Sequence, residues 1–457
     1  MNNEIVCDVI VVGAGISGLH TANLLLEQGK DVLLLEARDR VGGRSLNHEF
    51  KNGDLVDVGG QWVGPGHDRM YDLLKKHGIE TYPLYNRGKN LIRFKQKLKK
   101  YTGAIPKLSL WHLIQMGWLL WRFDELAKSI DTAQPYNHKN AIKWDSITVQ
   151  NWMEKNSTSK VAQKAFSIGI KAIFTVEPKE ISMLHALFYA KSGNSMDTLI
   201  SVDGGAQQDR IHGGSHGLCS ALSEKVGDRL KLSHAVSQVD YSDSHVSVQC
   251  FNDQSFKATK IIFALPPNQL LRMQFTPALP ATKDQLWQRM PAGSCIKCVA
   301  QYAKPFWRER NLSGQAVGLD SELLVNVTFD NTEKGKTAGL LMGFIEGDNA
   351  RYWGQKSEAE RKSAVLNCFA AYFGPDAMQP IDYVDKDWSN EAWTRGCYAG
   401  NPTPGTWTEF GQYIRQAIGP IHFAGTETAT QWYGYFEGAL ESGERAAQEV
   451  ILELDKN

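Results

Sequence analysis

The feature that most constrains this fold is a glycine-rich turn between a buried strand and a helix near the N-terminus. Residues 8–12, Asp-Val-Ile-Val-Val, contain a short, β-branched apolar run after the aspartate, typical of a strand buried on both faces. Gly13, Gly15 and Gly18 follow in a G-x-G-x-x-G pattern, and leucines and an alanine then recur at helical spacing. A second apolar run ends at Glu36. This order predicts a strand–turn–helix–strand unit of the dinucleotide-binding kind.

The residue types in this unit suit a pyrophosphate ligand. Gly13 permits the tight turn, Gly15 lets the backbone approach the phosphates, and Gly18 lets the helix pack closely on the sheet. Free N–H groups at the helix N-terminus attract the phosphate charge. Glu36 can accept hydrogen bonds from the ribose hydroxyls, and its charge disfavours the 2′-phosphate of NADP. From this motif alone, FAD and NAD both remain open.

Two further glycine pairs follow, in residues 38–44 and 57–63. Paired glycines let the backbone approach a flat ligand, and Arg38 and Arg44 can meet its phosphates. An NAD dehydrogenase would not need this second set of glycines. The arrangement resembles the flavin-containing amine oxidase family, which lies within the wider group of glutathione-reductase-like FAD proteins.

The resemblance continues at the C-terminus. Residues 421–430 have the pattern of a strand running into a turn, and residues 431–439 open a helix. This segment is similar to the monoamine oxidase version of the motif, nearly residue for residue. Residues 233–236 and 261–267 resemble the family's adenine-side strand and its crossover between domains. The resemblance therefore covers nearly the whole chain and points to the monoamine oxidase branch, in a form without a membrane anchor.

The resemblance implies FAD as the cofactor. In the family, the N-terminus of the last helix points at the pyrimidine side of the isoalloxazine, where its partial positive charge stabilises the reduced flavin. The expected cofactor-binding residues are Gly13, Gly15, Gly18, Glu36, Arg38, Gly43, Arg44, Gly60, Gln61, Trp62, Val236, Trp388, Cys397, Gly425, Thr426, Glu427, Tyr435 and Phe436.

Cys397 matches the cysteine that carries a thioether to the flavin 8α-methyl group in monoamine oxidases. The resemblance therefore implies covalent attachment of FAD through Cys397. Many bacterial relatives have another residue at this position and bind FAD non-covalently. The alternative for Cys397 is an inert buried thiol, the usual state of an intracellular cysteine.

The resemblance also implies three catalytic residues. Lys297 matches the lysine that holds a water against flavin N5, although its sequence context alone also suits an exposed strand position. Tyr398 and Tyr435 match the two parallel tyrosines that sandwich the substrate amine in front of the flavin. Aromatic faces attract an arriving ammonium without supplying a charge partner.

The expected substrate cavity is apolar. Gln207 falls where family members line the cavity, but the segment around it is one residue out of step with mammalian monoamine oxidases, so Gln208 remains an alternative. No carboxylate stands at the matched positions, which favours an apolar or aromatic primary amine over putrescine or spermidine. The expected lining residues are Trp62, Phe174, Leu199, Ile200, Gln207, Val327, Tyr398 and Tyr435.

The implied fold class is α/β, with mixed α+β character. An FAD-binding Rossmann-like domain of the glutathione-reductase type is expected beside a substrate domain with a mixed β-sheet and helices. No linker or internal repeat divides the chain. The segments that resemble the FAD domain are discontinuous, and the segments of the substrate domain lie between them. The FAD domain is expected to combine residues 1–83, 204–266 and 384–457, and the substrate domain residues 84–203 and 267–383.

The charge balance and the hydrophobic segments of the chain argue against several other classes of protein. The 50 Lys and Arg balance the 50 Asp and Glu, which argues against a nucleic-acid partner. Residues 108–121 are too short and interrupted to span a membrane, and are expected to form a buried or surface-docking helix. Together with the absence of a signal peptide, this predicts a soluble, cytoplasmic protein. The sequence leaves open whether the protein forms a homodimer.

The cysteines indicate neither disulfides nor a metal site. Seven cysteines are scattered along the chain, which fits a reducing compartment. Cys295 and Cys298 resemble a redox or metal pair, but they fall in a predicted strand, where residues three apart point to opposite faces. No second pair completes a zinc site. No metal is therefore expected.

The resulting hypothesis is a flavin-dependent amine oxidase. The neutral amine would deliver a formal hydride to FAD, giving an imine that water hydrolyses to aldehyde and ammonia, and O2 would reoxidise the flavin with release of H2O2. The alternatives are a polyamine or diamine oxidase, and a flavin dehydrogenase or desaturase acting on a non-amine substrate. A non-catalytic flavoprotein scaffold is a third class, disfavoured by the lysine, cysteine and tyrosines together.

Overall fold

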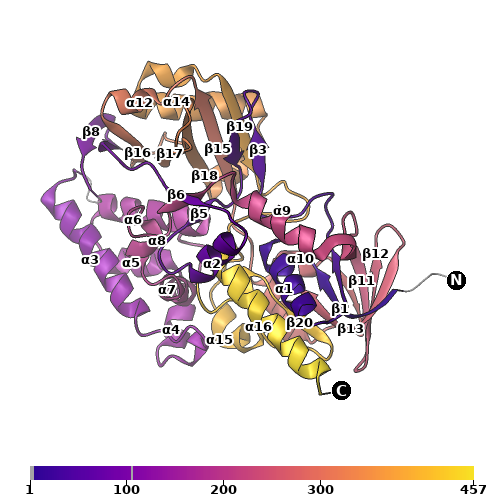
Figure 1. The fold of residues 1–457 in the computed structure, drawn as a ribbon. Coiled ribbons are helices and arrows are strands. Elements are labelled where there is room, and N and C mark those ends of the chain that lie inside the picture. Colours follow the sequence, from indigo (N-terminus) through magenta and orange to yellow (C-terminus); the bar gives the residue numbers. More distant parts are fainter. Residues whose placement is uncertain (1–4, 104–106, 457) are drawn as a thin grey trace.

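Two large β-sheets, each covered by helices, lie next to each other in the computed structural model, which describes residues 5–103 and 107–456 (Figure 1). The first sheet has eight strands in the order β10-β2-β1-β13-β12-β11-β14, and β20 also pairs with β13. Its strands are β1 (Ile5–Val12), β2 (Val32–Leu35), β10 (Leu230–Lys231), β11 (Val236–Tyr241), β12 (Val246–Cys250), β13 (Ser255–Phe263), β14 (Gln274–Thr276) and β20 (Ile421–Phe423).

The parallel core of this sheet brings distant parts of the chain to one edge. Strand β1 pairs in parallel with both β2 and β13, and β13 pairs in parallel with β20. Their carboxyl ends therefore lie together, followed by Gly13, Glu36, Ala264 and Ala424. The crevice outside the carboxyl ends of parallel strands is where such sheets bind ligands.

Close helix packing supports this edge. Helix α1 (Ile16–Glu27) follows the glycine turn and packs against α16 (Phe436–Leu454) and α9 (Ser215–Val226). A Cβ atom on Gly18 would lie 1.9 Å from the Gly13 carbonyl oxygen, so only glycine allows α1 to start this close to β1. The predicted strand–turn–helix–strand unit is thus confirmed.

The second sheet has the strand order β19-β15-β18-β17-β16-β7-β8. The expectation that Cys295 and Cys298 point to opposite faces is confirmed. Cys298 packs among residues of α14 (Glu358–Phe373), whereas Cys295 packs with Trp388 and Cys397 on the other face. The strands are β7 (Lys89–Phe94), β8 (Lys97–Tyr101), β15 (Cys295–Tyr302), β16 (Leu312–Gly318), β17 (Val327–Asp330), β18 (Gly339–Glu346) and β19 (Asp382–Asp387).

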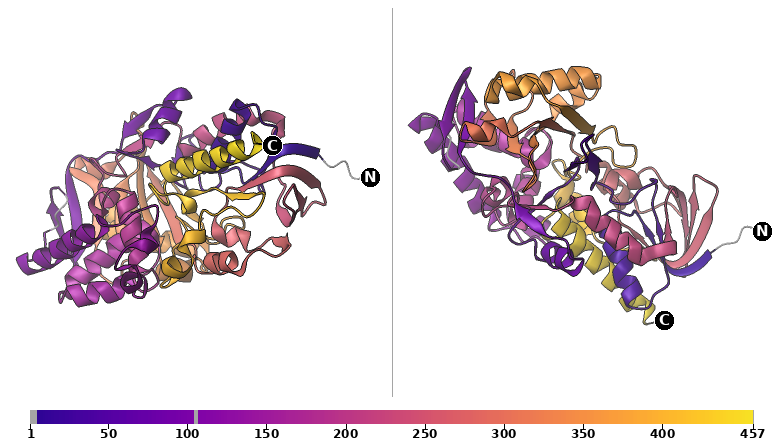
Figure 2. Two further views of the ribbon diagram at one scale, coloured as in Figure 1. Left: turned by 90° about the horizontal axis from the view of Figure 1, so that it is seen from below. Right: turned by 45° about the horizontal axis from the view of Figure 1, so that its top comes forward.

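A group of helices packs at the end of the molecule that is remote from strands β11–β13, beside β7 and β8 (Figure 2). It contains α3 (Leu110–Ala127), α5 (Val149–Asn156), α6 (Lys160–Phe174), α7 (Met183–Ser192) and α8 (Met196–Ile200). The remaining elements are short helices and strands: α2 (Asp68–Lys76), α4 (Ala141–Asp145), α10 (Pro267–Leu270), α11 (Ala281–Gln288), α12 (Phe306–Glu309), α13 (Asp348–Trp353), α15 (Thr406–Phe410), β3 (Asn47–Glu49), β4 (Leu55–Asp57), β5 (Trp62–Val63), β6 (Thr81–Pro83) and β9 (Asp209–Ile211).

Within residues 5–103 and 107–456, no helix combines the length and the hydrophobicity that crossing a bilayer requires. In the same described part of the chain, no group of three His, Cys, Asp or Glu side chains converges so that it could hold a metal ion.

Candidate active site

A cavity of about 820 Å³ runs from the carboxyl edge of the first sheet to the face of the second sheet. Glycine turns line one end, and aromatic and aliphatic side chains line the other. The structure brings most of the predicted site residues to this cavity: Gly13, Gly15, Glu36, Arg38, Gly43, Arg44, Gly60, Gln61, Trp62, Leu199, Ile200, Gln207, Lys297, Val327, Trp388, Cys397, Tyr398, Gly425, Thr426, Tyr435 and Phe436.

Four predicted residues lie outside this lining. Gly18 lies beneath the turn, and the buried Glu427 pairs with Arg44 behind the wall. Val236 lines a smaller neighbouring cavity of about 280 Å³, which shares Gly13, Glu36 and Arg38 with the large one. The fourth residue is Phe174.

Phe174 is not a wall of the substrate cavity. It is the last residue of α6, and its ring packs against Tyr189 of α7 with a centroid distance of 4.6 Å. Tyr189 lies in front of it and lines the cavity instead.

The start of α1 forms the anion-binding part of the cavity. Gly15 is the N-cap residue, no side chain caps the helix, and its first turn holds no acidic residue. Its first N–H groups therefore remain available to a phosphate. A Cβ atom on Gly15 would meet no atom within 4 Å, so the space above it is open to a ligand. These features fit the pyrophosphate of FAD.

Glu36 is held in position by the main chain. One carboxylate oxygen accepts a hydrogen bond from the Ala14 N–H at 2.7 Å, and the other accepts from the Arg38 N–H at 2.9 Å. The Arg38 guanidinium lies 3.4 Å from Glu36 and 3.2 Å from Glu391, so carboxylates already balance its charge. Glu36 thus stands where the ribose of a dinucleotide would lie.

Arg44 ties the glycine turn to the C-terminal part of the site. Its guanidinium donates to Glu427 and to the Tyr398 carbonyl oxygen, each at 2.6 Å. Burial opposes the charge of Arg44, but the Glu427 carboxylate outweighs burial and raises the arginine pKa. This buried pair fixes the backbone that carries Tyr398.

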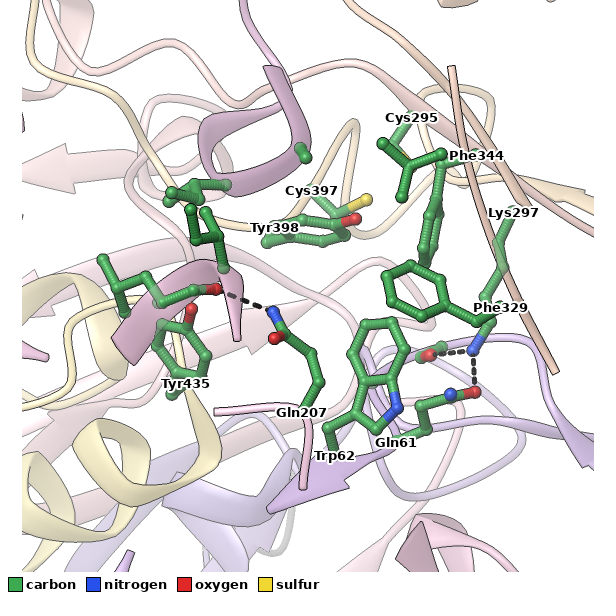
Figure 3. A pocket seen from close by; sticks show the side chains of 18 of the residues that line it. Gln61, Trp62, Gln207, Cys295, Lys297, Phe329, Phe344, Cys397, Tyr398 and Tyr435 are labelled. Carbon is green, nitrogen blue, oxygen red and sulfur yellow. Dashed lines mark hydrogen bonds between the residues drawn. The ribbon is translucent and has the colours of Figure 1, made fainter. Parts of the chain in front are cut away.

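Lys297 is only 2% exposed and reaches the cavity from β15. Its Nζ donates to the Gly59 carbonyl oxygen at 2.9 Å and to Gln61 Oε1 at 2.5 Å, as Figure 3 shows. Gln61 in turn donates to Asn331 Oδ1 at 2.9 Å. Burial lowers the pKa of Lys297 to about 7, so an uncharged amine is well populated near neutral pH. The exposed-strand alternative for Lys297 is therefore wrong.

Tyr435 is fixed by other rings around it. Its ring centroid lies 5.2 Å from that of Trp432, 5.6 Å from that of His67 and 6.1 Å from that of Tyr189. Burial raises the pKa of Tyr435 well above its usual value and lowers that of His67 to about 3. Both groups are therefore uncharged at neutral pH, and they give this side of the cavity an uncharged aromatic wall.

Tyr398 belongs to a second aromatic series. The centroid of its ring lies 6.1 Å from that of Phe344. The Trp62 ring packs against both Phe344 and Phe329, with centroid distances of 6.0 and 5.1 Å (Figure 3). Burial raises the pKa of Tyr398 well above its usual value, so the phenol stays protonated. These rings extend along the cavity from Tyr398 toward the Lys297 side.

Cys397 is buried at the cavity wall beside Tyr398. Its carbonyl oxygen accepts a hydrogen bond from the Thr175 hydroxyl, which holds the loop. The Trp388 indole donates to the Val58 carbonyl oxygen at 2.9 Å and closes the same side. The thiol therefore faces the ligand space from a fixed backbone.

Sequence reasoning missed several lining residues. Phe329 lies two positions after Val327 on β17, so strand alternation could have identified it. Phe344 pairs with Lys297 across β15 and β18, a register that local sequence does not reveal. Asp197 and Asp203 also line the cavity at exposed positions. They place two carboxylates at its rim, where none was expected.

Fold and site together define a dinucleotide-binding oxidoreductase of the flavoprotein type, with an aromatic substrate cavity. The family model described as flavin containing amine oxidoreductase matches residues 16–451. AofH of Mycobacterium tuberculosis, provisionally named a flavin-containing monoamine oxidase, is 39% identical over 447 residues, which cover 98% of this chain and 97% of that protein. The flavin-containing amine oxidase A of Canis lupus familiaris is 38% identical over 456 residues, covering 98% and 86%.

Solved structures of two amine oxidases are also similar to this chain over nearly its whole length. Putrescine oxidase bound to putrescine has a TM-score of 0.94 at 32% identity, over 98% of this chain and all of that one (100%). Cyclohexylamine oxidase from Brevibacterium oxydans IH-35A also has a TM-score of 0.94, at 30% identity over 98% and 99%. This chain belongs to the flavin-containing amine oxidoreductase family and is an FAD-dependent amine oxidoreductase.

Proposed function

We propose that this enzyme oxidises a primary apolar or aromatic amine, giving an imine that hydrolyses to aldehyde and ammonia, with O2 reduced to H2O2. The observation that carries the proposal is the uncharged aromatic wall around Tyr398 and Tyr435, which lines the same cavity as Lys297. FAD, when bound, supplies the two-electron acceptor for the amine and passes those electrons to O2.

The two tyrosines bind and orient the amine. Their faces attract the arriving ammonium by cation–π interaction. Because neither phenol is ionised, no counter-ion stabilises the ammonium form, and the amine can react as the neutral base. Gln207 donates to the Leu199 carbonyl oxygen at 2.7 Å, which leaves its own carbonyl oxygen without a partner in the described structure. That oxygen is an acceptor for the substrate N–H.

Lys297 acts in the half-reaction in which O2 reoxidises the flavin. Gly59 and Gln61 hold its amine, which would orient a water against the flavin. Replacement of Lys297 by Met should slow reoxidation by O2 about tenfold or more, while reduction by amine changes little. Stopped-flow measurement of the two half-reactions separates these effects, and an equal loss in both would contradict this role.

Cys397 is the proposed site of a covalent thioether to FAD. Its burial at the cavity wall supports this assignment. In a redesign of cofactor binding in putrescine oxidase, one variant carries an alanine-to-cysteine substitution, which is consistent with a cysteine acting near the cofactor. After acid precipitation of the holoenzyme, flavin should stay in the pellet, whereas flavin in the supernatant would exclude the link.

Peroxide formation across a panel of amines tests the proposed reaction. Benzylamine, phenethylamine and cyclohexylamine should yield H2O2, aldehyde or ketone, and ammonia in equal amounts. Turnover of a non-amine substrate without peroxide would instead indicate a flavin dehydrogenase. An enzyme that forms no product but binds flavin would indicate a scaffold.

Oxidation of diamines is the second candidate. Asp197 and Asp203 at the rim could pair with the distal ammonium of a diamine, and the wild-type putrescine oxidase structure is among the similar ones. Both carboxylates are exposed, so each ion pair is worth little. A kcat/KM for putrescine above that for benzylamine would favour this candidate.

A further inference from the structure

Helix α3 carries an exposed apolar face that the catalytic function does not use. Five large apolar side chains on this one helix are 44–74% exposed: Leu110, Trp111, Ile114, Trp118 and Trp121. From Trp111 onward the spacing is three, four and three residues, which aligns the side chains in one stripe along the helix. The rings of Trp118 and Trp121 lie 5.1 Å apart. Contiguous exposed apolar surface of this kind marks an interaction site.

The opposite side of α3 faces the protein. Leu119 and Phe123 are buried, and Met116 and Leu120 line the active-site cavity. The exposed stripe is therefore not needed to hold the helix in place. Helix α3 itself lies at the same end of the molecule as the β7–β8 hairpin (Figures 1 and 2).

A strongly basic surface adjoins this stripe. Residues 81–123 contain nine Lys and Arg and no Asp or Glu, whereas the rest of the chain has 41 Lys and Arg against 50 Asp and Glu. Lys97, Lys99 and Lys100 are exposed on β8, and no ion pair in the described structure involves them. Lysines can protect an edge strand such as β8 from pairing. That role does not explain the missing acidic residues or the exposed tryptophans.

We propose that the Trp111–Trp121 stripe and the β8 lysines form one docking surface for an anionic phospholipid bilayer. Tryptophans favour the boundary between headgroups and acyl chains, and an amphipathic helix lies in that plane with its apolar face buried. Lysines beside it are attracted to anionic headgroups. The helix rests on the membrane and does not cross it.

Charge complementarity favours a bilayer over a second copy of this chain. In an isologous dimer through α3, the basic surfaces of both copies would face each other and repel. An anionic bilayer neutralises the same charges. The surface also adjoins the cavity entrance, because Thr102 and Gly103, just after β8, are exposed and line the cavity. Apolar amines that partition into the bilayer would thus reach the active site directly.

Co-sedimentation of the holoenzyme with vesicles tests this proposal without measuring catalysis. Binding should be about tenfold or more stronger on phosphatidylcholine vesicles containing phosphatidylglycerol than on phosphatidylcholine alone, and should weaken in high salt. The W118Q/W121Q variant and the K97Q/K99Q/K100Q variant should each lose most of this binding. Tyr352→Gln, which alters a ring 57% exposed on α13, is the matched control and should bind as the wild type.

Two further measurements complete the test. Lipids brominated in their acyl chains should quench tryptophan fluorescence of the wild type on binding, and less so in W118Q/W121Q. Flavin content and amine turnover in solution should match wild type in every variant, which excludes misfolding. No preference for anionic vesicles, or a dimer in light scattering that W118Q/W121Q dissociates, would overturn the proposal. Either result is independent of whether the proposed amine chemistry is correct.

Discussion

The end of the cavity beside β1 and β2 is lined mainly by glycine and main chain, whereas the end beside β17 and β18 is lined by side chains from distant segments. The first end offers main-chain N–H groups and the Glu36 carboxylate to a cofactor, and the positions of these groups follow from one short unit of sequence. The second end depends on tertiary packing of rings. Changes at the first end should therefore remove the cofactor, and changes at the second should alter the reaction while the cofactor stays bound.

The largest effect is expected for Gly18→Ala. The added Cβ would lie 1.9 Å from the Gly13 carbonyl oxygen, so α1 must move away from the turn that meets the phosphates. We expect loss of most bound flavin and of about 3 kcal/mol of stability. The flavin-to-protein absorbance ratio and thermal unfolding measure this. Gly217→Ala in α9, where a Cβ meets nothing within 4 Å, is the control and should retain flavin.

The next effect concerns the two tyrosines. Replacement of both Tyr398 and Tyr435 by Ala removes the aromatic faces and should lower kcat/KM for benzylamine about 100-fold, or about 2.8 kcal/mol, with flavin content unchanged. Replacement of both by Phe keeps the faces and should cost less than about tenfold. Full activity in the double Ala variant would exclude the proposed amine site.

A smaller effect is expected on stability from Lys297→Met. Burial lowers the pKa of Lys297 to about 7 in the folded state, below the 10.5 of an unperturbed lysine. The charged lysine therefore destabilises the folded state by the full amount below pH 7. Wild-type stability should therefore rise from pH 7 to about 10.5 relative to the variant. In the variant, Gly59 and Gln61 lose their hydrogen-bond donor, which offsets part of this effect. The free energy of unfolding of the variant at pH 6 should therefore exceed that of the wild type by about 1–2 kcal/mol. A stability difference that is constant across pH 6–10 in urea unfolding would show that Lys297 does not change its charge in this window.

The smallest effect is expected at the rim. Asp197→Asn combined with Asp203→Asn should lower kcat/KM for putrescine about two- to threefold at low salt and leave benzylamine unchanged, because exposed charges act weakly and are screened. The difference should vanish at high salt. A tenfold loss specific to putrescine would instead assign these carboxylates to a diamine-binding site.

The same contrast explains what could be predicted from sequence. Gly13, Gly15 and Glu36 were predictable because their spacing along a strand–turn–helix unit fixes their positions in space. Tyr398 and Tyr435 came from resemblance, since no local pattern distinguishes them from ordinary packing tyrosines.

Other parts of the cavity lining depend on tertiary packing and could not be predicted from the sequence. Phe174 and Tyr189 are both aromatic and lie on neighbouring helices, and only their packing decides which one lines the cavity. Phe329, in contrast, was predictable from sequence, because the alternation of β17 places it on the same face as Val327. The rim carboxylates Asp197 and Asp203 depend on how α8 and the following turn are set against the sheet, which no periodicity encodes.

Anaerobic titration of the purified holoenzyme with benzylamine shows whether the aromatic end of the cavity presents an amine to the flavin. We expect the visible absorbance of oxidised flavin to bleach with one equivalent of amine, and this bleaching to slow about 100-fold when both Tyr398 and Tyr435 are replaced by Ala. Flavin that remains oxidised with every amine tested, yet is readily reduced by dithionite, would contradict this expectation.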